Sequence, residues 1–156
     1  MLHERHILDS VRAAPVFRPD ELQALDLGSG AGLPGIVLAI ALPRCRFVLV
    51  EPRRKRAGFL ELAKERLELT NVEVAIARAE DLEVVADVAT ARAFAQPAKA
   101  WAVGYRLLRP GGRLVYFAGS REAPEEIGTA LDPQPVEIQV VEGLANFPPL
   151  VIMTRG

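Results

Sequence analysis

A chain of 156 residues suits a single domain with a real hydrophobic core. The formal net charge of −1 at pH 7 excludes a protein that binds nucleic acid over its whole surface, so such a role needs a local patch of positive charge. The single cysteine, Cys45, excludes an internal disulfide framework and a zinc site made of cysteines. It fits the reducing cytoplasm.

The sequence carries no sign of export or membrane insertion. Its longest apolar stretch, residues 33–43, contains glycine and is too short to cross a bilayer. Residues 1–10 are charged and amphipathic, unlike a secretory signal. We therefore expect a cytoplasmic monomer without a membrane partner or a metal. A single domain should span residues 1–156, with residues 1–20 forming a helix and a loop packed on it.

Strands and helices alternate through the first half of the chain. The apolar patterns predict a helix over 5–13, a loop at 15–20, strands over 22–27, 46–51 and 72–77, and helices over 33–41 and 53–69. The run at 46–51 is continuously apolar, which is typical of a parallel strand buried on both faces. For the helix over 53–69 we expect an inner face made of Phe59, Leu60, Ala63 and Leu67.

The second half continues the alternation and then breaks it. The patterns predict strands over 87–92 and 112–119, helices over 98–108 and 124–131, and two last strands over 136–142 and 150–154. No helix fits between the last two strands, so they should be antiparallel neighbours. The fold class is therefore α/β: a doubly wound, Rossmann-like, seven-stranded and mostly parallel sheet with one antiparallel strand near its C-terminal edge.

A glycine-rich segment follows the first predicted strand and indicates a ligand site. "LDLGSGAGLPGIVLAI" places Gly28, Gly30 and Gly32 where ligands bind in open α/β sheets, beyond the carboxyl ends of the strands. Glu51 ends the second strand, where a carboxylate can accept hydrogen bonds from both hydroxyls of a ribose. The segment also fits the dinucleotide pattern G-x-G-x-x-G, and glycines can serve a tight turn alone.

Other features favour S-adenosylmethionine over a dinucleotide. Asp26 precedes the first glycine by two residues, where its charge can help to hold the ammonium group of the ligand, whereas a pyrophosphate would gain nothing from it. "RAED" at 78–81 follows the third strand, where polar groups can read an adenine edge. The chain also lacks a second mononucleotide-binding half. Alternatively, Asp26 is a helix-cap or loop carboxylate, and Glu80 is a surface charge that caps a short helix.

A run of positive charge, "RRKR", begins the helix over 53–69. Arg53, Arg54, Lys55 and Arg56 lie at the positive end of the helix dipole, where each cation is unfavourable by a few tenths of a kcal/mol. Local stability does not explain them, so we interpret these four residues, the basic turn, as a contact for RNA phosphate. The alternative is a solvated turn that avoids the cost by exposure.

Together these segments resemble the small-subunit ribosomal RNA methyltransferase G family, also called glucose-inhibited division protein B. Generic methyltransferases share only D-x-G-x-G-x-G, whereas the Leu-Pro-Gly tail of the loop and its companion segments are more specific. The matching segments run in chain order: "RHILDS" (5–10), the glycine-rich segment, "EPRRKRAGFL" (51–60), "LTNVEV" (69–74), "RAED" (78–81) and "ARAFA" (91–95).

The resemblance implies transfer of the methyl group of S-adenosylmethionine to N7 of a guanine in small-subunit ribosomal RNA. By position, Gly28 and Leu33 would line the cofactor loop, and Glu51 would take the ribose. Ala79 and Glu80 would meet the adenine. Arg92, at the end of the fourth strand, would face the active centre and hydrogen-bond O6 or a phosphate of the target. The alternative for Arg92 is a surface ion pair with Asp81 or Asp87.

The sequence departs from the family pattern on the substrate side. Members usually have a further helical segment ahead of "HILDS", and they carry Lys-Gly where this chain has Ala118–Gly119. "NFPPLVI" at 146–152 replaces a more polar approach. Two alternatives therefore stay open: a methyltransferase of the same fold with a small-molecule or protein substrate, and a cofactor-binding assembly or regulatory module without catalysis.

The chemistry of N7 agrees with the residues after the fourth strand. Guanine N7 has a free lone pair, so proximity and in-line orientation matter more than a general base. The segment "TARAFAQP" (90–97) has no Asn/Asp-Pro-Pro-aromatic clamp for an exocyclic amine and no cysteine that could add to a pyrimidine.

Overall fold

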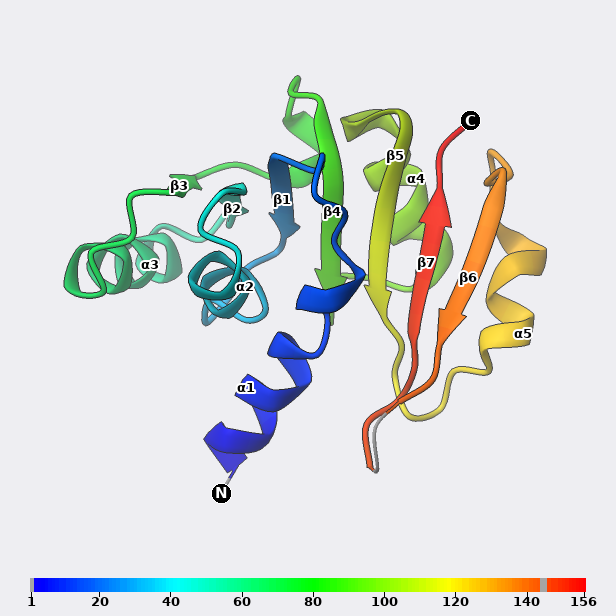
Figure 1. Ribbon diagram of the computed structural model, residues 1–156. Coiled ribbons are helices and arrows are strands. Elements are labelled where there is room, and N and C mark those ends of the chain that lie inside the picture. The colour runs from blue at the N-terminus through cyan, green and yellow to red at the C-terminus, as the bar shows by residue number, and fades with distance from the viewer. Residues whose placement is uncertain (1, 144–145) are drawn as a thin grey trace.

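The computed structural model describes residues 2–143 and 146–156, so the first residue of the predicted 1–20 segment lies outside the described residues. One seven-stranded sheet runs through the molecule in the order β3-β2-β1-β4-β5-β7-β6 (Figure 1). Its strands are β1 (Gln23–Leu27), β2 (Arg46–Val50), β3 (Val72–Ala75), β4 (Ala86–Arg92), β5 (Leu108–Phe117), β6 (Glu137–Val141) and β7 (Leu150–Thr154).

The pairing of the strands confirms the predicted fold class. Parallel pairs join β1 to β2, β1 to β4, β2 to β3, and β4 to β5. β7 is antiparallel both to β5 and to β6, so it is the one reversed strand and lies next to the edge. Because the chain places β2 and β3 on one side of β1 and β4 and β5 on the other, the switch point of the sheet lies between β1 and β4.

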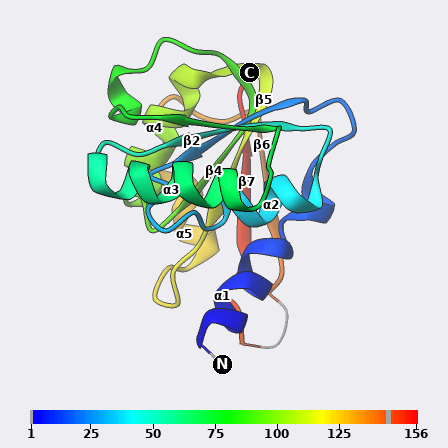
Figure 2. The same cartoon turned by 90° about the vertical axis from the view of Figure 1, so that its left-hand side faces the viewer.

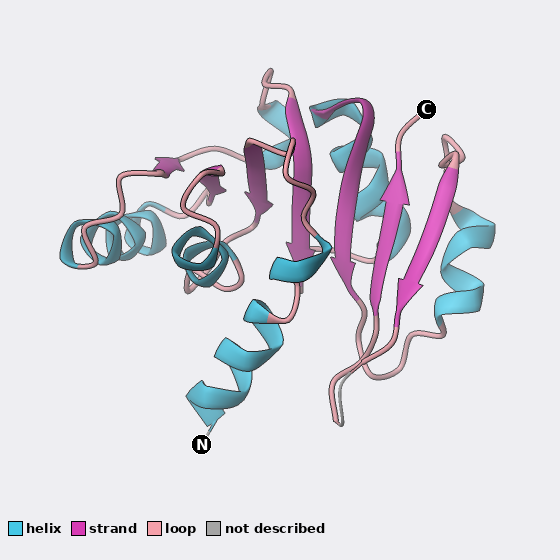
Figure 3. Cartoon of the chain, in the orientation of Figure 1, coloured by secondary structure: helices cyan, strands magenta, loops and turns pink. Residues whose placement is uncertain are grey.

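Helices cover both faces of the sheet and make a three-layer sandwich (Figures 2 and 3). They are α1 (Leu2–Val11), α2 (Gly35–Ala41), α3 (Arg54–Arg66), α4 (Pro97–Leu107) and α5 (Pro124–Ile127), with short 3-10 turns η1 (Ala14–Val16), η2 (Ala79–Asp81) and η3 (Gly128–Ala130). One core cluster packs α4 and α5 on the sheet through residues such as Trp101. The other packs α2, α3 and the segment after α1 on the opposite face.

The predicted inner face of α3 was wrong for two of its four residues. Leu60 is fully buried, but the side chains of Phe59 and Leu67 are 54% and 51% exposed. Ala57 is the other residue of α3 that is buried. Successive helix positions differ by about 100° in direction, and α3 covers the outer strands β2 and β3, so a narrow stripe through Ala57 and Leu60 is enough to contact them.

The carboxyl ends of β1, β4 and β5 point toward α1 in Figure 1. α1 therefore lies at the edge of the sheet that also carries the glycine-rich loop and the segment after β4. Parallel strands place all their following loops at this one edge, and the functional residues predicted from the sequence gather there.

Candidate functional site

The glycine loop between β1 and α2 has a positive φ at Gly28, Gly30 and Gly32. Gly28 has φ +66° and Gly30 has φ +54°, values that disfavour a side chain. A Cβ on Gly28 would lie 2.8 Å from Cδ2 of Phe94, whereas a Cβ on Gly30 would have only ordinary contacts, with the backbone oxygen of Gly28 at 3.8 Å and Arg56 Nη1 at 3.9 Å. Gly32 faces Ile36 and Leu60 instead, so it serves internal packing.

Asp26 fixes the start of the glycine loop through hydrogen bonds to β4 and α2. The hydroxyl of Thr90 donates to Oδ1 at 2.8 Å, and the backbone N–H of Gly35 donates to Oδ2 at 3.1 Å. Burial raises the pKa of Asp26 to about 6, against the lowering effect of these hydrogen bonds. The side chain is 1% exposed, and its carboxylate ties β1 to β4 and to the start of α2. This arrangement matches the loop-carboxylate alternative for Asp26.

Glu51 fastens the loop from the end of β2. Its Oε2 accepts a hydrogen bond from the backbone N–H of Gly30 at 3.0 Å, and its Oε1 accepts one from the backbone N–H of Arg53 at 3.1 Å. The residue is 3% exposed. A carboxylate has about four acceptor positions, so each oxygen of Glu51 keeps capacity for a further donor such as a hydroxyl.

A cavity of about 330 Å³ opens beside Gly28. Its walls combine apolar surfaces with charged rims and comprise Gly28, Val50, Pro52, Arg78, Ala79, Glu80, Phe94 and Lys99. Oε1 of Glu80 lies 3.6 Å from Lys99 Nζ and 3.9 Å from Arg78 Nη2. A backbone hydrogen bond at Glu80 lowers the pKa of its carboxyl, and the two cations lower it further. Leu33, half-buried in the glycine loop, does not line this cavity.

Arg92 ends β4 and pairs with α1. Its Nε donates to Asp9 Oδ2 at 3.0 Å, and its Nη2 lies 2.7 Å from His6 Nδ1. The predicted alternative partners were wrong, because Asp87 pairs with Arg109 at 2.6 Å and Arg92 is paired with Asp9. Both side chains of the Arg92–Asp9 pair are largely buried, at 20% and 14% exposed. The pair fixes the guanidinium while leaving other N–H groups free to bind.

A second cavity, of about 610 Å³, lies on the α1 side of Phe94 and is called the β4–β5 cavity below. It is lined by Asp9, Arg92, Ala93, Phe94, Ala95, Gln96, Tyr116, Phe117, Ala118, Gly119, Glu122 and Pro148. Phe94 lines both cavities and therefore forms the wall between them. One cavity includes the end of β1 and the other the end of β4, so the two flank the switch point of the sheet.

Comparison with known proteins shows the family to which the chain belongs. The family model described as rRNA small subunit methyltransferase G matches residues 1–140. The chain belongs to the small-subunit ribosomal RNA methyltransferase G family. A Clavibacter sepedonicus member is 44% identical over 126 residues, covering 80% of this chain and 59% of the relative. A Xanthomonas euvesicatoria member is 41% identical over 160 residues, covering 97% of this chain and 73% of the relative.

Solved structures confirm the fold of this family member. A SAM-dependent O-methyltransferase from Thermotoga maritima superposes with a TM-score of 0.78 at 19% identity, covering 95% of this chain and 64% of that one. TYW2 from M. jannaschii, solved in complex with AdoMet, has a TM-score of 0.74 at 18% identity, covering 96% and 74%. The chain spans 59 to 62% of the length of three of its curated relatives.

The basic turn lies at the same edge of the sheet as the two cavities. Arg53, Arg54, Lys55 and Arg56 are all exposed, and α3 has no acidic residue in its first turn. Within the described ranges, no carboxylate lies within ion-pair distance of these four side chains. The turn therefore presents four unneutralised cations to solvent.

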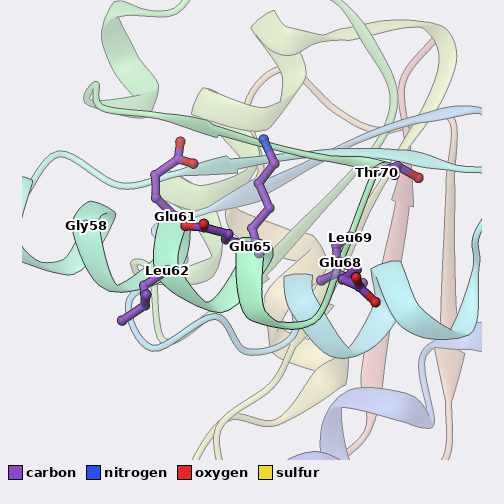
Figure 4. A pocket seen from close by; sticks show the side chains of 8 residues that line it. Gly58, Glu61, Leu62, Glu65, Glu68, Leu69 and Thr70 are labelled. Atoms are coloured by element: carbon purple, nitrogen blue, oxygen red, sulfur yellow. The ribbon is translucent and has the colours of Figure 1, made fainter.

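A larger hollow lies on the outside of α3. Figure 4 shows Glu61, Glu65 and Glu68 around it, together with Leu62 and Leu69. The hollow runs along α3 from Gly58 to Leu69 and Thr70, which precede β3, and no residue of the glycine loop lines it. Its carboxylates would repel a polyanion, which separates it from the candidate site.

The described residues offer neither a cluster of metal ligands nor a membrane-spanning helix. Residues 2–143 and 146–156 contain no group of three or more His, Cys, Asp or Glu side chains that could hold a metal ion. Over the same ranges, no helix is long and apolar enough to cross a membrane.

Sequence reasoning missed three residues of the β4–β5 cavity: Asp9, Phe94 and Glu122. Asp9 lies in "HILDS" and Phe94 in "ARAFA", so both were within the segments that carry the family resemblance, although no motif gives them a role. Glu122 had no sequence signal, because a single glutamate in a polar loop is usually solvated.

Proposed function

We propose that this chain is an S-adenosylmethionine-dependent methyltransferase that modifies N7 of a guanine in small-subunit ribosomal RNA. The two cavities at the switch point carry this proposal, one beside Gly28 and the other beside Arg92, with Phe94 between them. A cofactor in the first cavity and a base in the second would approach each other at this wall. Family membership supports both the cofactor and the RNA substrate.

The residues around the first cavity fit the parts of the cofactor. The lack of a side chain at Gly28 makes room for the Phe94 ring, and the backbone at Gly30 is open to close approach. Glu51 lies beside the cavity rather than in its lining, is hydrogen-bonded to Gly30, and retains acceptor capacity for ribose hydroxyls. Ala79 gives an apolar surface for the adenine, with the Glu80 carboxylate beside it as an acceptor. Leu33 helps to shape the loop. We assign Asp26 to the cofactor site as the residue that positions this loop, because it is 1% exposed and its hydrogen bonds join β1 to Thr90 of β4 and to Gly35 at the start of α2.

The reaction needs little proton chemistry from the chain. S-adenosylmethionine supplies an activated methyl group when it is bound. N7 of guanine attacks with its own lone pair, so the protein has to hold the base in line. Arg92 suits this task because Asp9 and His6 fix its orientation, and its remaining N–H groups can donate to O6 or to a phosphate.

The basic turn would bind the phosphate backbone of the RNA beside the cofactor. Its cations lie at the same edge of the sheet as Arg92, and they lack internal partners among the described residues. Phosphate contacts position the substrate without reading its sequence. We therefore assign Arg53, Arg54, Lys55 and Arg56 to substrate binding and Arg92 to the reacting base.

Methyl transfer from labelled S-adenosylmethionine to unmethylated small ribosomal subunits tests the proposal. Digestion of the RNA to nucleosides should yield labelled 7-methylguanosine. Protein-free RNA in a parallel reaction shows whether the assembled particle is required. Binding of S-adenosylhomocysteine, measured by calorimetry, shows independently whether the cofactor site is intact.

The outcomes separate the alternatives. Cofactor binding without any methylation of subunits or RNA would support a binding module or a methyltransferase with another substrate. A labelled nucleoside other than 7-methylguanosine would overturn the assignment of the target atom. Absence of cofactor binding in a folded protein would overturn the enzyme assignment itself.

A further inference from the structure

Glu122 contributes a carboxylate to the β4–β5 cavity, and the fold holds it in place. The hydroxyl of Tyr116 lies 2.9 Å from Oε1 and 3.1 Å from Oε2, and the backbone N–H of Gly119 donates to Oε2 at 2.5 Å. Tyr116 comes from β5 and is only 4% exposed, so it is a rigid support. A surface glutamate without a role would be mobile and solvated.

The hydrogen bonds define which groups donate and which accept. Burial raises the pKa of Tyr116, and the adjacent Glu122 raises it further, so the phenol keeps its proton at neutral pH. The single hydroxyl hydrogen and the Gly119 N–H occupy part of the acceptor capacity of the carboxylate, which is about four positions. Glu122 therefore keeps free acceptor positions beside the cavity that it lines.

Arg92, its ion-pair partner Asp9 and Glu122 all line the same cavity. Arg92 presents guanidinium N–H donors at the end of β4, and Glu122 presents carboxylate acceptors in the loop after β5. Each is fixed by a second side chain, Arg92 by Asp9 and Glu122 by Tyr116. A base that binds between them has to place a hydrogen-bond acceptor beside Arg92 and hydrogen-bond donors beside Glu122.

Guanine has an acceptor and donors in this order along its edge, and adenine does not. Both purines have N7, so the target atom cannot distinguish them. Guanine carries the O6 acceptor next to N7, followed by the N1–H and N2-amino donors. Adenine has an amino donor in place of O6 and an unprotonated N1. Adenine would therefore present a donor to Arg92 and an acceptor to a carboxylate.

We propose that Glu122 selects guanine by accepting hydrogen bonds from its N1–H and N2-amino groups while Arg92 faces O6. Tyr116 acts as a positioning residue through its hydrogen bond to Glu122. This inference rests on the proposed function and adds the residue that reads the Watson–Crick edge of the target.

Single-turnover methylation of small subunits by the Glu122→Gln variant tests the proposal. The rate of 7-methylguanosine formation at subsaturating subunits should fall about ten- to a hundred-fold, the range for loss of one bidentate base contact. The affinity for S-adenosylhomocysteine should stay within two-fold. Glu125→Gln removes the same charge from an exposed position three residues away that does not line the cavity, and it should methylate at the parental rate.

A double-mutant cycle with Tyr116→Phe separates positioning from general stability. Tyr116→Phe should slow methylation in the parent, and it should have little further effect in the Glu122→Gln background because its partner is already gone. Equal effects in both backgrounds would make Tyr116 merely structural and would contradict its positioning role.

The results distinguish failure of this inference from failure of the proposed function. Parental methylation by Glu122→Gln, with an active parent, overturns the role of Glu122 and leaves the methyltransferase proposal standing. A parent that binds the cofactor and never forms 7-methylguanosine overturns both.

Discussion

The carboxylates on the two sides of Phe94 are used in different ways. On the cofactor side, Asp26 and Glu51 are at most 3% exposed and accept hydrogen bonds from the backbone of the glycine loop and its neighbours. On the substrate side, Asp9 and Glu122 are more exposed and hold the side chains of Arg92 and Tyr116. The side that we propose for the cofactor is thus held mainly by hydrogen bonds to the backbone, and we call it the backbone cradle; the side that we propose for the substrate is a wall of side chains.

This difference indicates which changes should affect which ligand. A backbone cradle depends on local sequence and should tolerate little change. A wall of side chains can be altered one residue at a time without disturbing the cradle. Variants on the substrate side should therefore change methyl transfer alone, and variants on the cofactor side should change cofactor affinity and stability together.

The largest effect should come from Arg92→Ala. Loss of the guanidinium next to the reacting atoms should lower single-turnover methylation by about a hundred-fold or more, because small errors of placement are costly there. Affinity for S-adenosylhomocysteine should stay within a few-fold. Arg92→Lys should recover little activity, since an ammonium cannot reproduce the planar fork. Methylation at the parental rate would show that the Arg92–Asp9 pair is only structural.

Glu51→Ala should disturb the glycine loop and weaken cofactor binding. The N–H groups of Gly30 and Arg53 would lose their acceptor, and the cofactor would lose a charged partner for its ribose. We expect S-adenosylhomocysteine to bind about ten- to a hundred-fold more weakly, as for the loss of about 1.5–3 kcal/mol. Calorimetry measures the change, and Glu83→Ala, at an exposed position, serves as the matched control. An unchanged affinity in folded Glu51→Ala would exclude the ribose assignment.

Asp26 should make the free energy of unfolding depend on pH. Its pKa is about 6 in the folded chain and near 3.9 in an unfolded one, so the folded state binds more protons between these values. The contribution of Asp26 to stability is therefore fully present below about pH 3.9 and is lost as the pH rises through 6, by about 3 kcal/mol in all. Urea unfolding across this range should show a flatter pH dependence for Asp26→Asn than for the parent. Parallel profiles would show that Asp26 has an ordinary pKa.

The smallest effect should come from the basic turn. Replacing Arg53 and Arg54 with alanine should weaken RNA binding and reduce its salt dependence by up to about one unit of slope per lost contact. Cofactor affinity should not change. Lys64 and Arg66, at the other end of α3, give a control pair whose removal changes the net charge equally. Equal slopes for the two double variants would show that the basic turn has no specific contact with phosphate.

The same division describes what the sequence could predict. The cofactor side follows from local patterns, because β1, the glycine loop and Glu51 are close in the chain and each element has a strong hydrophobic signal. The mostly parallel sheet and the one reversed strand near its edge followed from the alternation of elements and the short connection before residue 150, whereas the order of the strands came only from the structure. The face of α3 did not, because Phe59 and Leu67 are apolar yet lie beside the narrow stripe that contacts β2 and β3.

The substrate side depends on contacts between distant parts of the chain. Asp9 and Arg92 are 83 positions apart, and only the folded sheet shows that α1 reaches the end of β4. The sequence proposed Arg92 for the active centre but could not name its partner. Tyr116 and Glu122 are close in sequence, yet their contact requires the turn at Gly119 to bring the loop back over β5.

The position of β7 has a consequence for how the chain assembles. β7 follows β6 in the chain but lies between β5 and β6, and all five of its residues are buried. β6 therefore has no neighbour to pair with until β7 has docked on β5. Until then, β5 remains an open edge, and open edges template pairing with other chains. A chain truncated so that β7 is missing should accordingly aggregate. The docking of β7 on β5 should be the folding step that removes the open edge and prevents self-association.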